Sequence, residues 1–386
     1  METPIYLDYN ATTPVDPRVR TAMLPYLAGE FGNPSSTHVF GRSARAAMDR
    51  SRHQVADLLG CSPDEIVFSS GGSESDNLAI QGAAFANRAH GRHIITSTTE
   101  HPAVLSTCKY LVEQHGYDVT YVDVDAGGRV DPDAVRCAIR EDTLLISIMH
   151  ANNETGTLQP IKEIAGIARA SGILFHTDAS QSVGKIPTRV EDLGVDLLTI
   201  AGHKLYAPKG IGVLYVRRGV HLQPIILGGG QECGLRAGTE NVSHMVALGQ
   251  ACAVAAELLP KEEARQRSLR DRLHAMLVEE LAGMQRNGHP DASLPNTLNV
   301  TFQGLIGSDL LDAVPEVAFS TGSACHAGIA TASPVLLQMG LGTDIALGAV
   351  RLSLGRYTTE EEIEAAAHYL VRGVRELRER SANAGC

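Results

Sequence analysis

The chain has 386 residues, which is enough for one large domain and a smaller one. A hydrophobic content of 44% and a charged content of 20% are typical of a folded globular protein and exclude an intrinsically disordered chain. The formal net charge of -11 argues against a protein that binds nucleic acid directly, because neutralising phosphates takes an excess of Lys and Arg.

Apolar runs alternate with helical patterns from about residue 64 to residue 216. The predicted strands cover 65–68, 93–96, 119–122, 144–148, 173–175, 197–200 and 212–216. The predicted helices between them cover 75–88, 102–115, 132–140 and 161–171. This alternation predicts an α/β fold in which right-handed crossovers build a mostly parallel seven-stranded sheet with helices on both faces.

A long helical stretch, rich in Ala, Leu, Glu and Arg, covers about 240–283 and is expected to link two domains. The rest of the chain mixes short strands with helices, which predicts a smaller α+β domain. These elements are strands at 297–300 and 350–353 and a charged helix at 359–380. We expect residues 15–258 to form the large domain, and residues 1–14 and 259–386 to form the small one.

The N-terminal segment Met1–Tyr6 lacks the basic and apolar pattern of a signal peptide. No run of about 18 apolar residues is present, so we expect no membrane-spanning helix and no membrane partner. The predicted location is the cytoplasm.

Polar residues follow several of the predicted strands. Ligands of parallel α/β sheets bind beyond the carboxyl ends of the strands, so these residues are expected to converge. They are Glu100–His101, Asn152–Asn153, Asp178 and His203–Lys204.

Asp178 and Lys204 predict the cofactor. Asp178 ends one apolar run, and Lys204 ends another 26 residues later, beside His203. A pyridoxal phosphate enzyme needs a carboxylate to keep the pyridine nitrogen protonated and a lysine to hold the aldehyde as a Schiff base. A lone lysine after a strand is more often a solvated surface residue, and it is the surrounding pattern that favours the cofactor. Gln181 is placed to contact the ring hydroxyl.

The segment Ser69–Glu74 follows a strand and opens a helix. Glycines there let the backbone approach an anion, and a helix N-terminus supplies N–H donors. Gly72 and Ser73 are therefore predicted to hold the cofactor phosphate. The purely structural alternative is a helix cap of the form Ser73-x-x-Asp76, and both interpretations can be true together.

His101 and Cys325 carry reactive side chains. A histidine after a strand suits stacking on the cofactor ring and general acid–base work near neutral pH. Seven cysteines, without C-x-x-C pairs, argue against a disulfide framework or a zinc site, and no metal site is predicted. Cys325 lies among small residues, which fits equally an accessible nucleophilic thiol or a buried cysteine.

Ordered motifs along nearly the whole chain carry a family resemblance. The chain resembles the cysteine desulfurases of the NifS/IscS group, within the class V aminotransferase family of fold-type I pyridoxal phosphate enzymes. The motifs are Tyr6–Pro14, Gly32–Ser36, Asn152–Gly156, Gly228–Glu232, Arg236–Asn241, Ser320–Gly328 and Arg351–Arg356.

The resemblance implies a role for each matching residue. Lys204 is implied as the Schiff-base lysine, Asp178 as the pyridinium partner and His101 as the stacking acid–base residue. Gln181 is implied as the contact of the ring hydroxyl. The implied phosphate ligands are Gly72, Ser73, His203 and, from the other subunit of a homodimer, Thr239. The implied substrate-carboxylate ligands are Asn153, which also counts among the cofactor-binding residues, and Arg351.

The resemblance also implies a reaction. L-cysteine would be converted to L-alanine, and its sulfur would remain as a persulfide on Cys325. A sulfur-acceptor protein would then use it for iron–sulfur cluster assembly, tRNA thiolation or another thio-cofactor. Whether Cys325 also ligates an iron–sulfur cluster stays open.

Two departures from the family pattern affect the substrate. Ala201 stands where many family members carry serine, and the segment from Cys325 to Pro334 is slightly longer than the usual pattern. These features are similar to selenocysteine lyase, which releases selenide and L-alanine from L-selenocysteine and is the alternative function.

Overall fold

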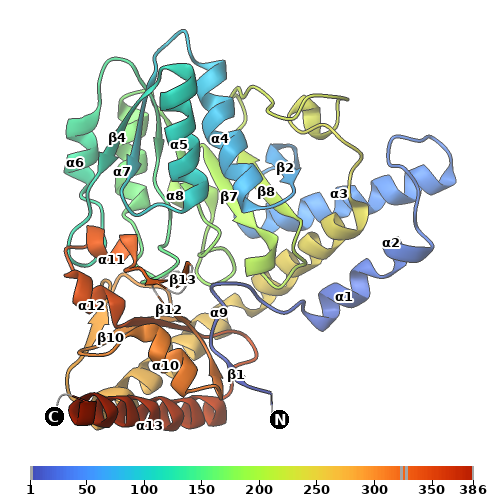
Figure 1. Ribbon diagram of the computed structural model, residues 1–386. Helices are drawn as coiled ribbons and strands as arrows, with labels where there is room; N and C mark the ends of the chain where they lie inside the picture. Colours follow the sequence, from blue (N-terminus) through green and yellow to red (C-terminus); the bar gives the residue numbers. More distant parts are fainter. Residues whose placement is uncertain (1–2, 322–324, 327–328, 385–386) are drawn as a thin grey trace.

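The computed structural model describes residues 3–321, 325–326 and 329–384 (Figure 1). A large sheet with helices on both faces and a smaller sheet with its own helices occupy opposite ends of the molecule (Figure 1). The long helix α9 (Val242–Glu280) runs from one to the other.

The large sheet has seven strands in the order β2-β8-β7-β6-β5-β3-β4. Strand β8 is antiparallel to both of its neighbours, and the other adjacent pairs are parallel. The predicted fold class, a mostly parallel seven-stranded sheet with a smaller α+β part, is therefore confirmed. The strands are β2 (Ile66–Ser69), β3 (His93–Ser97), β4 (Asp118–Val122), β5 (Thr143–Ser147), β6 (Leu174–Asp178), β7 (Leu197–Ala201) and β8 (Gly212–Val216).

Side chains alternate between the two faces of this sheet, as the pleat of a strand requires. Ile94 and Leu145 belong to the hydrophobic core under α4 and α5. Their neighbours Ile95 and Ile146 belong to the core on the opposite face, which also contains residues of α3, α7 and α9. The helices of the crossovers are α4 (Gly72–Ala86), α5 (Pro102–His115), α6 (Pro132–Ala138), α7 (Ile161–Ala170) and α8 (Val190–Leu193).

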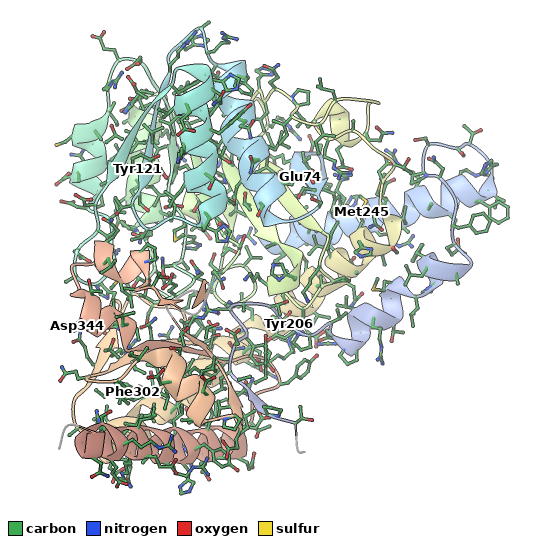
Figure 2. All side chains as sticks on the ribbon, viewed as in Figure 1. Glu74, Tyr121, Tyr206, Met245, Phe302 and Asp344 are labelled. Atoms are coloured by element: carbon green, nitrogen blue, oxygen red, sulfur yellow. The ribbon has the colours of Figure 1, made fainter. Side chains whose placement is uncertain are left out.

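The smaller sheet is antiparallel, in the order β12-β15-β10-β9. Strand β1 (Ile5–Tyr6) pairs in parallel with β11 (Val317–Ala318), which brings the N-terminal segment into this part. Its core includes Phe302, which Figure 2 places there. The remaining elements are β9 (Met284–Asn287), β10 (Thr297–Phe302), β12 (Ser320–Thr321), β13 (Cys325–His326), β14 (Ile329–Ala330), β15 (Ala349–Ser353), α10 (Gly307–Ala313), α11 (Pro334–Gln338), α12 (Thr343–Leu347) and α13 (Glu360–Ala384).

Helix α9 contributes to both hydrophobic cores. Leu248 and Cys252 pack in the core of the large sheet, and Leu269 and Leu273 pack in that of the small one. The predicted domain boundary at 258/259 falls between these two sets and stays a prediction. By length and composition alone α9 could cross a membrane, contrary to the sequence expectation, but 56% of its most apolar window is buried inside the molecule.

No element is predicted before residue 64, yet three helices lie there. They are α1 (Pro17–Met23), α2 (Pro25–Ala28) and α3 (Val39–Leu59). Much of the buried face of α3 consists of small residues such as Gly41, Ala44 and Ala47. Because small residues give a weak apolar periodicity, the sequence does not reveal this helix.

Candidate active site

A cavity of about 350 Å³ lies between the carboxyl edge of the large sheet and the smaller domain. Nine of the eleven predicted site residues line it, and those that follow β3, β5, β6 and β7 converge there as predicted. The lining residues are Asn10, Ala11, Gly72, Ser73, Asp76, His101, Met149, Ala151, Asn153, Asp178, Ser180, Gln181, Ala201, His203, Lys204 and Arg351.

The N-terminus of α4 forms one end of the cavity. Gly72 is the first residue of this helix and Ser73 the second, so the unpaired N–H groups of the first turn are available to an anion. A Cβ atom at Gly72 would lie 3.1 Å from Ser180 Oγ and 3.2 Å from the Cβ atom of Ala201. A larger residue than glycine would therefore crowd the place where an anion can approach the backbone.

Lys204 reaches into the cavity from the turn that follows β7. Its Nζ atom donates hydrogen bonds to the backbone carbonyl oxygens of Asn10 and Ala11, the latter at 2.8 Å. Burial, followed by the charge of Arg351, lowers the pKa of Lys204 to about 8, although Asp178 acts in the opposite direction. An appreciable fraction of this lysine is consequently a neutral amine near neutral pH.

Tyr206 fixes the turn behind Lys204 and lies near the junction of the two domains (Figure 2). Its φ of 64° is in the left-handed region, which a tyrosine adopts only where its surroundings impose it. The Tyr206 N–H donates to Thr13 Oγ1 at 2.9 Å, and its hydroxyl accepts from the Arg356 N–H at 2.6 Å. The Arg356 guanidinium also lies 4.2 Å from the ring centre. Contacts from the N-terminal segment and from the segment after β15 thus hold the backbone that presents Lys204.

Asp178 and Gln181 face the cavity from the end of β6. Asp178 is 8% exposed, and its Oδ1 atom accepts a hydrogen bond from the Ser180 N–H at 2.9 Å. Gln181 Nε2 donates to the Asn10 carbonyl and Gln181 Oε1 accepts from Lys185 Nζ, each at 3.0 Å. These contacts fix the orientation of the Gln181 amide, with Nε2 towards Asn10 and Oε1 towards Lys185.

His101 and His203 differ in their surroundings. His101 is exposed, and its Nδ1 atom accepts from the Ala103 N–H at 3.1 Å, which caps α5. Desolvation lowers the pKa of His101. Desolvation, followed by Lys204 and Lys209, lowers the pKa of His203 to about 4, so this imidazole is neutral at physiological pH.

Arg351 enters the cavity from β15 of the small domain. Its Nη1 atom donates to the Asn153 carbonyl at 3.1 Å and its Nη2 atom to Asp8 Oδ1 at 2.7 Å. Arg351 is 8% exposed, so its charge acts in a largely desolvated place. This arrangement brings a guanidinium next to the backbone of Asn153.

Comparison with known proteins identifies the family. A family model described as "Aminotransferase class-V" matches residues 5–366. The chain belongs to the class V aminotransferase family. It is similar to the cysteine desulfurase IscS of Anaeromyxobacter dehalogenans (strain 2CP-C), at 48% identity over 384 residues, covering 99% of this chain and 95% of that protein.

Further relatives agree. The cysteine desulfurase IscS of Klebsiella pneumoniae subsp. pneumoniae is 47% identical over 386 residues, covering 99% of this chain and 95% of that protein. A solved NifS-like protein superposes with a TM-score of 0.90 at 39% identity, covering 97% of this chain and 100% of that one. The structure "SspA in complex with cysteine" gives a TM-score of 0.81 at 42% identity, covering 92% and 100%. The resemblance to the NifS/IscS group is confirmed.

Two predicted site residues of this class V aminotransferase are not among the cavity lining. Thr239 is exposed and lies in a separate hollow with Ser70 and Gly210. Its predicted role belongs to the cavity of a second subunit and stays a prediction. The backbone of Cys325 pairs with Ala330, but the side chain of Cys325 lies outside the described part of the structure.

Three buried ionisable residues close to the predicted site residues were assigned no functional role from the sequence: Asp76, Glu100 and Lys185. Asp76 lines the cavity, and one of its oxygens lies 3.6 Å from His176 Nε2. Lys185 Nζ donates to Asn10 Oδ1 and Gln181 Oε1, each at 3.0 Å. The burial of a polar residue cannot be read from the sequence. No local signal therefore showed that these three residues are buried, apart from their nearness to predicted site residues.

Glu100 makes the stability of the fold dependent on pH. Its oxygens accept hydrogen bonds from the Met149 N–H at 2.9 and 3.0 Å and from the Ser97 hydroxyl at 2.7 Å. Burial raises its pKa to about 8. The folded protein keeps this proton above the ordinary glutamate pKa while the unfolded chain releases it, so stability falls as pH rises from about 4.5 towards about 8.

Replacing Glu100 with Gln is expected to remove this contribution. Between about pH 5 and about pH 8, the wild type should lose a few kcal/mol of unfolding free energy that Glu100→Gln retains, up to about 1.4 kcal/mol per pH unit. The measurement is the urea unfolding midpoint across this pH range. Parallel profiles for the two proteins would show that Glu100 is ionised in the folded state.

Proposed function

We propose that this class V aminotransferase is a pyridoxal-phosphate-dependent cysteine desulfurase, which converts L-cysteine to L-alanine and leaves sulfur as a persulfide on Cys325. The observation that carries the proposal is the single cavity onto which Lys204, Asp178 and the N-terminus of α4 open. The relatives named cysteine desulfurase and the related structure in complex with cysteine support the same substrate.

The residues present fit pyridoxal phosphate. Gly72, Ser73 and neutral His203 would hold the phosphate at the N-terminus of α4, where the lack of a side chain at Gly72 leaves the backbone N–H groups open to an anion. Asp178 would pair with the ring nitrogen, and Gln181 would donate to the ring hydroxyl. The bound cofactor would supply a sink for the electrons released at the substrate Cα.

Lys204 would hold the aldehyde carbon of the cofactor. The same amine is placed to accept the Cα proton of the substrate, because its pKa of about 8 leaves it partly neutral. His101, at the mouth of the cavity, would deliver protons to the product carbon. General acid–base steps of this kind contribute about 10²- to 10⁴-fold each.

Arg351 and Asn153 would bind the substrate carboxylate, for which a guanidinium fork is geometrically suited. The Cys325 thiolate would attack the substrate sulfur. An S–S bond forms while the Cβ–S bond breaks, and the carbon fragment keeps the electron pair and takes up protons to become alanine. A sulfur-acceptor protein for iron–sulfur clusters, thio-cofactors or tRNA thiolation would then consume the persulfide.

A cytoplasmic homodimer is part of this proposal. Large apolar side chains are exposed on α2, on the start of α3 and on the segment that joins them, in the part of the chain that projects from the body of the molecule (Figure 1). Phe31 is 73% exposed and stacks on Phe40, with ring centres 5.5 Å apart. An exposed apolar patch of this kind is typical of a protein–protein interface. In such a dimer Thr239 would reach the partner's cavity.

The test is product release by the purified holoenzyme with dithiothreitol, supplied with L-cysteine or L-selenocysteine in parallel. We expect sulfide and alanine from L-cysteine in equal amounts. Selenide from L-selenocysteine, with L-cysteine left intact, would make the protein a selenocysteine lyase. Pyruvate or a keto acid in place of alanine would instead indicate transamination or elimination.

A further inference from the structure

Asp8 lies where a carboxylate of the substrate is expected. Asp8 Oδ1 accepts a hydrogen bond from Arg351 Nη2 at 2.7 Å and another from the Ser320 hydroxyl at 2.8 Å. The Ser320 hydroxyl also accepts from Arg351 Nη2 at 2.9 Å. We propose that Asp8 is an internal placeholder for the substrate carboxylate on Arg351, which sets the affinity of the enzyme for its substrate. This proposal rests on the proposed function, in which Arg351 is the carboxylate ligand.

Three neighbouring strands bring these side chains together. Ser320 of β12 pairs directly with Arg351 of β15, and Asp8 forms a parallel bridge with Ser353, two residues further along β15. Asp8 and Arg351 are thus held on the small domain by backbone pairing, independently of their ion pair. The backbone pairing therefore keeps the two side chains close to each other, without relying on the conformation of a long, exposed side chain.

These contacts leave part of the hydrogen-bonding capacity of the Arg351 guanidinium unused. Within the described residues, the buried Arg351 Nε atom has no hydrogen-bond partner. Nε and Nη2 form one edge of the guanidinium, which is the edge that binds a carboxylate through two parallel hydrogen bonds. Asp8 holds only the Nη2 position. An incoming carboxylate that takes both donors must displace one of the two acceptors on Nη2, Asp8 Oδ1 or Ser320 Oγ, which are themselves hydrogen-bonded to each other.

The displacement has an expected consequence for affinity. When a site is competent only while an internal group is released, the apparent affinity is reduced by the fraction that is competent. The side chains of Asp8 and Arg351 are only 19% and 10% exposed, so the ion pair is largely shielded from water and Asp8 is an effective competitor for Arg351. Displacement of Asp8 also removes the acceptor of the Ser320 hydroxyl, in the strand from which the chain continues to Cys325.

The experiment compares L-alanine with L-alaninamide, which lacks the carboxylate, by titration calorimetry on the holoenzyme. Asp8→Asn removes the charge and keeps the shape. It should lower the Kd for L-alanine by about 3- to 10-fold, the range of the net contribution of one hydrogen bond, and leave the Kd for L-alaninamide unchanged. An unchanged or raised Kd for L-alanine would overturn the proposal, because Asp8 would then orient Arg351 and not compete for it.

Two further variants separate the inference from the function on which it rests. Arg351→Lys should weaken the binding of L-alanine much more than the binding of L-alaninamide. In the Arg351→Lys background, Asp8→Asn should not change the Kd for L-alanine. If Arg351→Lys leaves the preference for L-alanine intact, the carboxylate site itself is assigned wrongly. Asp8→Ser provides a second neutral variant if Asp8→Asn lowers the thermal unfolding midpoint. A fall in the Kd for L-alanine with Asp8→Ser supports the placeholder, and no fall contradicts it.

Discussion

Lys204→Ala is expected to abolish desulfurase activity, with a loss of about 10⁴-fold or more. The variant removes the only amine that lines the cavity along the described residues, and with it the proposed covalent hold on the cofactor and the proposed base near the substrate Cα. The purified variant should also lack the visible absorbance of a lysine-bound cofactor. Absorbance and product release together give the measurement.

Lys209→Ala is the matched control for Lys204→Ala. Lys209 is an exposed lysine five positions later, outside the cavity lining, so its loss should leave colour and turnover near those of the wild type. A coloured and active Lys204→Ala protein would remove the basis of the proposed function. Added primary amines should restore part of the activity if the lysine acts as a base.

Cys325→Ser is expected to separate cofactor chemistry from sulfur transfer. A serine hydroxyl is almost fully protonated near neutral pH and attacks sulfur poorly, whereas a thiolate is an effective nucleophile. The variant should keep the cofactor absorbance and its Kd for L-alanine, while sulfide release falls by about 10³-fold or more. The measurement is sulfide release together with alkylation of a persulfide after exposure to L-cysteine.

The control for Cys325→Ser is Cys137→Ser, which replaces an exposed free thiol on α6, away from the cavity. It should not change sulfide release. Wild-type sulfide release by Cys325→Ser would mean that sulfur leaves the substrate without attack by this thiol. The alternative interpretation of Cys325, a buried cysteine in a turn of small residues without a catalytic role, would then apply.

The sequence predicted the residues whose chemistry is set by their position after a strand. Asp178 and Lys204 each follow an apolar run, and the carboxyl ends of parallel strands meet at one edge, so their convergence follows from the topology. Gly72 was predicted because a glycine at a helix N-terminus is a local pattern that indicates an anion-binding turn. The family motifs then gave the reaction, which local pattern alone leaves open.

Other features depend on contacts between distant segments. Asp8 meets Arg351 across 343 positions of the chain, and Lys185 meets Asn10 across 175. No local periodicity encodes such a pairing. The raised pKa of Glu100 has the same origin, because it follows from desolvation by the surrounding segments and not from the residue itself.

By itself, the sequence determined the fold class and the family and predicted the candidate cofactor residues at the strand ends, because strand and helix periodicities and ordered motifs are local properties. Only the tertiary structure decided which charges are buried, which group occupies Arg351 and how Tyr206 holds the turn of Lys204. The physical reason is that desolvation and ion pairing depend on what surrounds a side chain, and those surroundings come from segments far apart in the sequence.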